Sequence, residues 1–100
     1  MKVMISQPMQ GKTEEEIRKE RAAVVEQLEK EGHTVVDTIF NLEVPEGSNT
    51  GMYYLSESIR KMSEVDAVVF LPGWQHARGC AIENQVAQLY GKYIRYYMEG

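Results

Sequence analysis

Glu83 is the ionisable residue whose position in the sequence best suits chemistry on a bound ligand. It follows an apolar run at 67–71 and a glycine-containing turn, and it precedes a helical pattern that reaches Tyr90. This order predicts a buried strand, a turn, and a helix whose first turn carries the carboxylate. In a parallel α/β sheet, ligands bind at the loops that leave the carboxyl ends of the strands. We therefore expect Glu83 to lie at such a site.

Several features around Glu83 favour a ligand site. Gly79, Cys80 and Ala81 are small, so a ligand can approach the backbone there. Trp74 either forms a flat apolar wall of the site or anchors the core. The dipole of the predicted helix favours an ionised carboxylate, which suits a nucleophile better than an acid. The simpler explanation is that an acidic residue in a first helical turn only stabilises its helix.

A second loop, at residues 6–12, also leaves the end of a predicted strand. It runs into the glycine, lysine and threonine at 11–13, which match the last part of a P-loop. Ser6, however, stands where that motif requires glycine, Pro8 removes one backbone amide, and three glutamates follow. These departures argue against a nucleoside triphosphatase. Ser6 and Gln7 can still offer hydrogen bonds to a polar ligand.

Composition excludes several classes of partner. The net charge is −4 and the chain contains no basic run, which argues against a nucleic-acid polymer. A single cysteine and two histidines argue against a disulfide and a metal centre, and no cofactor is expected. No stretch approaches the roughly 20 apolar residues of a membrane span. The N-terminus does not resemble a signal peptide. We expect one domain over 1–100, located in the cytoplasm.

The hydrophobic pattern alternates between strands and helices. Thr13 and Glu16 form a capping box at the start of the first helix, and Gly32 follows its end. The residues at 40–51 indicate a long loop. The expected strands lie at 2–6, 33–37, 67–71 and 93–97, and the expected helices at 14–31, 52–63 and 79–90. This order predicts a parallel sheet with helices on both faces.

Other polar and aromatic residues have structural explanations. Asp66 lies at the amino end of its strand, opposite the expected site, where a hydrogen bond at the strand start is the better interpretation. Cys80 is expected to pack in the interior, and His76 to lie in a loop. Of the adjacent Tyr53 and Tyr54, one is expected to face the site and the other the core. The tyrosine-rich last strand is expected at an edge of the sheet, which favours a homo-oligomer, a dimer or larger.

The ordered set of motifs resembles the nucleoside 2-deoxyribosyltransferase-like superfamily, which includes the 2′-deoxynucleoside 5′-phosphate N-hydrolases. The sequence is most similar to small phage and bacterial domains of this group, and the resemblance covers nearly the whole chain. Its marks are VMISQPMQG at 3–11, GHTVV at 32–36, Tyr54 with Ile59, DAVVFLPGW at 66–74 and RGCAIE at 78–83.

The resemblance implies a flavodoxin-like, three-layer αβα fold with a four- to five-stranded parallel sheet. It also implies hydrolysis or transfer at the N-glycosidic bond of a 2′-deoxynucleoside or its 5′-monophosphate. Glu83 would attack the anomeric carbon and form a covalent glycosyl-enzyme, as in retaining glycosidases. The residues expected to bind the substrate are Ser6, Gln7, Met9, Gly11, Tyr54, Ser58, Trp74 and Gly79.

Ser58 departs from the family pattern. The family has an aspartate there, which assists the leaving base, and serine is no general acid near neutral pH. Ile82 also stands where the enzymes favour a small residue. A non-catalytic nucleoside- or nucleotide-binding module is therefore the alternative. A flavin-binding protein is disfavoured, because the first loop lacks the expected hydroxyl-rich phosphate grip.

Overall fold

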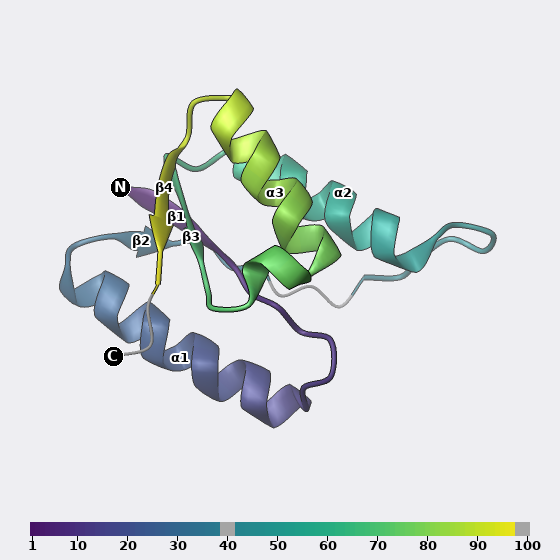
Figure 1. The fold of residues 1–100 in the computed structure, drawn as a ribbon, viewed down its shortest axis with the longest axis horizontal. Helices are drawn as coiled ribbons and strands as arrows, with labels where there is room; N and C mark the ends of the chain where they lie inside the picture. Colours follow the sequence, from purple (N-terminus) through teal and green to yellow (C-terminus); the bar gives the residue numbers. More distant parts are fainter. Residues whose placement is uncertain (39–41, 98–100) are drawn as a thin grey trace.

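The computed structural model describes residues 1–38 and 42–97 (Figure 1). Strands and helices alternate along this part of the chain, as expected. The strands are β1 (Lys2–Ser6), β2 (Thr34–Val35), β3 (Ala67–Phe70) and β4 (Tyr93–Tyr96). The helices are α1 (Glu14–Lys30), α2 (Thr50–Met62), the 3₁₀ helix η1 (Trp74–His76) and α3 (Arg78–Leu89).

The sheet is parallel throughout and has the strand order β2-β1-β3-β4. Helix α1 lies on one side of it, and α2 and α3 lie together on the other (Figure 1). This is the expected flavodoxin-like, three-layer arrangement, with four strands among the described residues. From β1 the chain continues to β2 on one side, and from β3 to β4 on the other. The switch point of the sheet therefore lies between β1 and β3.

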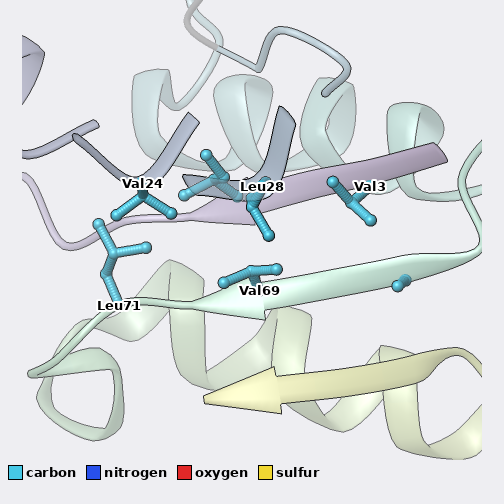
Figure 2. Close-up of a cluster of buried hydrophobic side chains, with 7 residues drawn as sticks. Val3, Val24, Leu28, Val69 and Leu71 are labelled. Carbon is cyan, nitrogen blue, oxygen red and sulfur yellow. The ribbon is translucent and has the colours of Figure 1, made fainter. Parts of the chain in front are cut away.

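Side chains alternate between the two faces of the sheet and so build two apolar clusters. Beneath α1, Val3 and Val69 pack against Val24 and Leu28 of the helix (Figure 2). The other cluster joins the sheet to α2 and α3. Its members are Met4, Met62, Val65, Val68, Phe70 and Ala87. The central strands β1 and β3 are therefore buried on both faces, which explains their continuous apolar runs.

The predicted ends of α1 are confirmed. The Thr13 hydroxyl accepts a hydrogen bond from the Glu16 amide, and Glu16 reaches back to the Thr13 amide. Gly32 has a φ of 90°, and the next amide, of His33, donates to Leu28 O. The left-handed conformation explains why a glycine follows the helix.

Several boundaries differ from the sequence-based prediction, most of them by one residue. Strand β2 spans two residues instead of the five expected at 33–37. Helix α2 begins two residues earlier, because the Asn49 side chain caps it by accepting from the Met52 amide at 3.0 Å. The 3₁₀ helix η1 was not predicted. Of the expected loop at 40–51, residues 40 and 41 lie outside the described part of the chain. No helix in the described ranges is long and apolar enough to cross a membrane.

Candidate functional site

The candidate site lies at the switch point, where β1 and β3 end side by side. Ser6 and Phe70, the last residues of these strands, are paired in register, and the Leu71 amide donates to Ser6 O at 3.0 Å. The loops that follow these two strands also approach each other. A methyl group added at Gly73, in the second loop, would lie 3.7 Å from Pro8 Cγ in the first. The two loops singled out in the sequence therefore meet at one edge of the sheet.

Glu83 is buried on α3, with 8% of its surface exposed. Burial raises the pKa of its carboxyl to about 7, and the nearby Ser6 hydroxyl offsets part of that rise. The expectation of a first-turn carboxylate was wrong, and burial works against the fully ionised form that was expected. Helix α3 begins at Arg78, which places Glu83 in the second turn, where the effect of the helix dipole has fallen off. Burial therefore outweighs the dipole, and near neutral pH the group is divided between its two forms.

Ser6 and Cys80 lie close to this carboxyl. The Ser6 side chain points to the α3 side of the sheet, because it alternates with Met4, which packs in the cluster beneath α2 and α3. Its buried Oγ forms no hydrogen bond of regular geometry with any residue in the described ranges. Cys80 is buried as expected, and burial, together with the charge of Glu83, raises the pKa of its thiol. The Ser6 hydroxyl thus lies beside Glu83, where it acts on the carboxyl and where a ligand can also engage it.

Gln7 points to the opposite side of the sheet. Its Nε2 donates to Ile17 O at 2.9 Å and to Glu20 Oε1 at 3.1 Å. Lys12 donates to both oxygens of Glu20. Although burial acts to raise it, the hydrogen bonds from Lys12 and Gln7 hold the pKa of Glu20 below its usual value. Gln7 and Lys12 therefore fasten the first loop to α1, and within the Gln7 amide the buried Oε1 lacks a partner among the described residues.

Trp74 belongs to an aromatic group at the end of the sheet. Its ring lies 5.5 Å from that of Phe70 and 5.3 Å from that of Tyr96, on which it stacks. The Tyr96 hydroxyl accepts from Asn84 Nδ2 at 3.1 Å, and Asn84 follows Glu83 on α3. Trp74 thus anchors η1 to the core, the second of the two roles considered for it. Asn84 and Tyr96 were not singled out in the sequence, because their contact joins a helix to a strand that follows it.

The remaining expected ligand residues occupy different surroundings. Tyr54 on α2 exchanges hydrogen bonds with the backbone of Leu42, so its hydroxyl holds the preceding loop. Met9 and Gly11 are exposed, and Gly11 has a φ of 80°. Ser58 is half-buried on α2. A Cβ on Gly79 would meet no atom within 4 Å, so the space beside α3 there is open.

Asp66 has the structural role expected of it. Its carboxylate accepts a hydrogen bond from the Lys2 amide at 2.9 Å, at the amino end of the sheet. Within residues 1–38 and 42–97, no group of three or more His, Cys, Asp or Glu side chains could hold a metal ion. The polar groups near the switch point instead include Glu83 and Ser6.

Together these features define a parallel α/β domain of flavodoxin-like order with a buried carboxyl at its switch point. The chain belongs to the family DUF4406, described as a domain of unknown function, whose model matches residues 1–96. No curated protein matches the sequence.

Proposed function

We propose that this protein is a member of the nucleoside 2-deoxyribosyltransferase-like superfamily that cleaves or transfers the N-glycosidic bond of a 2′-deoxynucleoside or its 5′-monophosphate. The observation that supports the proposal is the buried carboxyl of Glu83 beside the buried hydroxyl of Ser6, at the switch point of the sheet. The ligand is a small molecule, and no cofactor takes part. We place the protein in the cytoplasm.

In the proposed reaction, the ionised Glu83 attacks the anomeric carbon as the bond to the base breaks. The bonding electrons go to the base, which takes up a proton from solvent water, and a glycosyl ester forms on the carboxyl oxygen. Water or a second base then cleaves that ester and restores the carboxylate. Because the pKa of Glu83 is about 7, about half of the molecules carry the nucleophilic form at neutral pH. A hydrogen bond from a sugar hydroxyl would stabilise this form further.

The alternative is a binding module that recognises the same ligands without cleaving them. Ser58 supports it, because serine cannot protonate the leaving base. The raised pKa of Glu83 also suits this role, since a protonated carboxyl can both donate and accept a hydrogen bond to a base edge.

The test is chromatographic detection of free base after incubation with each deoxynucleoside and each deoxynucleoside 5′-monophosphate. We expect wild type and the exposed control Glu64→Gln to release base, and Glu83→Gln to release none. Calorimetric titration with the same compounds identifies the alternative. Binding without release by any protein supports the binding module, and neither binding nor release contradicts both functions.

A further inference from the structure

The two edges of the sheet differ in length and in side chains. Strand β2 is two residues long, and such a short edge offers little for another strand to pair with. Strand β4 has four residues, and its first, Tyr93, is 68% exposed. No other strand in the described part of the chain pairs with its outer side. Of the two edges, β4 is therefore the one that offers the longer stretch of backbone for pairing with another strand.

The backbone groups that face outward on β4 follow from its pairing with β3. The Tyr93 amide donates to Asp66 O and the Tyr97 amide to Phe70 O, so alternate residues are bonded inward. The amides and carbonyls of Ile94 and Tyr96 consequently point to the open edge. The Lys92 amide is already bonded to Ala87 O at 2.9 Å, which leaves its carbonyl as the acceptor at the start of the strand.

We propose that β4 pairs antiparallel with β4 of a second copy of this chain, about a two-fold axis at Ile94. In this register, Ile94 lies opposite the second copy's Ile94, and Tyr96 opposite its Lys92. Four backbone hydrogen bonds form, two between the Ile94 residues and one from each Tyr96 amide to a Lys92 carbonyl. The interface is independent of the chemistry proposed for Glu83.

Side-chain pairing favours this register over the one centred on Arg95. With the axis at Arg95, two like charges would lie directly opposite, which is destabilising. With the axis at Ile94, each Tyr93 lies opposite the second copy's Arg95 on the α1 side of the sheet. Arg95 is held there by Glu31, with hydrogen bonds of 2.5 and 3.2 Å. These bonds use the edge of the guanidinium and leave its face to stack on the tyrosine ring. Each copy thus offers both a tyrosine and an arginine that match those of the other copy. The β4 edge is therefore complementary to a second copy of itself, which identifies the partner.

Two substitutions of the exposed Tyr93 test both the surface and the register by light scattering over a dilution series. Tyr93→Lys places like charges opposite each other twice per dimer, so we expect Kd to rise at least about tenfold. Tyr93→Glu places a carboxylate opposite each Arg95, so Kd should stay within about threefold of wild type or fall. Met52→Lys, which changes a 69% exposed residue on α2, is the control. Circular dichroism verifies that each variant is folded.

Hydrogen exchange of the unmodified protein provides a second measurement. The amides of Ile94 and Tyr96 should become protected as the concentration rises, whereas the amides of Tyr93, Arg95 and Tyr97 should be protected at all concentrations. The dimer has twice the 11.5 kDa mass of one chain. A wild-type protein that stays monomeric, a dimer with unprotected Ile94 and Tyr96 amides, or equal effects of lysine and glutamate at position 93 would each overturn the proposal.

Discussion

The Trp74 indole stacks on the Tyr96 ring, with centroids 5.3 Å apart and planes inclined by 21°. This contact joins the turn after β3 to the last strand. The Tyr96 hydroxyl in turn accepts a hydrogen bond from Asn84, the residue next to Glu83. The position of the candidate carboxyl on α3 is thus connected with the packing of η1 and β4.

Removing this stack should destabilise the protein measurably. We expect Trp74→Ala to lower the free energy of unfolding by about 2 kcal/mol, less than for a fully buried tryptophan because Trp74 is half-buried. Urea denaturation measures the effect, with Tyr90→Ala, at a 79% exposed position, as the control. Equal stabilities of the two variants would show that the stack contributes nothing.

The raised pKa of Glu83 predicts a pH-dependent effect of Glu83→Gln on stability. The unfolded chain loses this proton near pH 4.5 and the folded protein near pH 7, so burial of the charge destabilises the wild type increasingly between these values. Above pH 7 the variant should be more stable than wild type by roughly 3 kcal/mol, and below pH 4.5 about equally stable.

Urea denaturation of both proteins at several pH values tests this prediction. The other carboxylates are common to both, so the difference isolates Glu83. A gap that stays constant with pH would mean that Glu83 has an ordinary pKa in the folded protein.

The same ionisation predicts the pH dependence of the proposed reaction. As a nucleophile, Glu83 must be deprotonated, so kcat/KM for base release should rise with pH and level off above about 7. Initial rates at low substrate concentration give this profile. A decline above pH 7 would instead assign Glu83 as an acid.

Gly79→Ala tests whether a ligand contacts the backbone of α3, because the substitution should weaken ligand binding without destabilising the fold. The added methyl meets no atom of the protein and favours the helix, so stability should stay level or rise by up to about 1 kcal/mol. A ligand that approaches the backbone there should bind about tenfold or more weakly. Gly51→Ala, the corresponding second residue of α2, is the matched control in calorimetric titrations. Unchanged affinity in Gly79→Ala would place the ligand elsewhere.

Ser58→Asp tests the loss of the assisting acid. If the site is otherwise competent, we expect base release to increase by about 100-fold, the lower end for general acid catalysis. Ser56→Asp, two residues earlier on α2 and exposed, should change nothing. A folded Ser58→Asp protein with the wild-type rate would contradict the idea of a degraded enzyme.

The elements were predictable because their signals are local. The capping box at Thr13, the glycine after α1 and the apolar runs of β1 and β3 each involve neighbouring residues. The raised pKa of Glu83 was not predictable, because burial depends on how α3 packs on the sheet. The stack of Trp74 on Tyr96 escaped prediction for the same reason, since it joins segments about twenty residues apart in the sequence.

Ser6 and Gln7 are consecutive, yet the hydroxyl lies beside Glu83 while the amide is bonded to α1. Inserting or deleting a single residue within β1 would exchange their sides, directing the amide at the carboxyl and the hydroxyl at the helix. Such a change would remove the contact of Ser6 with Glu83 on one face of the sheet and the hydrogen bonds of Gln7 to α1 on the other. Length variation among natural homologues should therefore fall before Lys2 or after Pro8, and this strand should evolve by substitution alone.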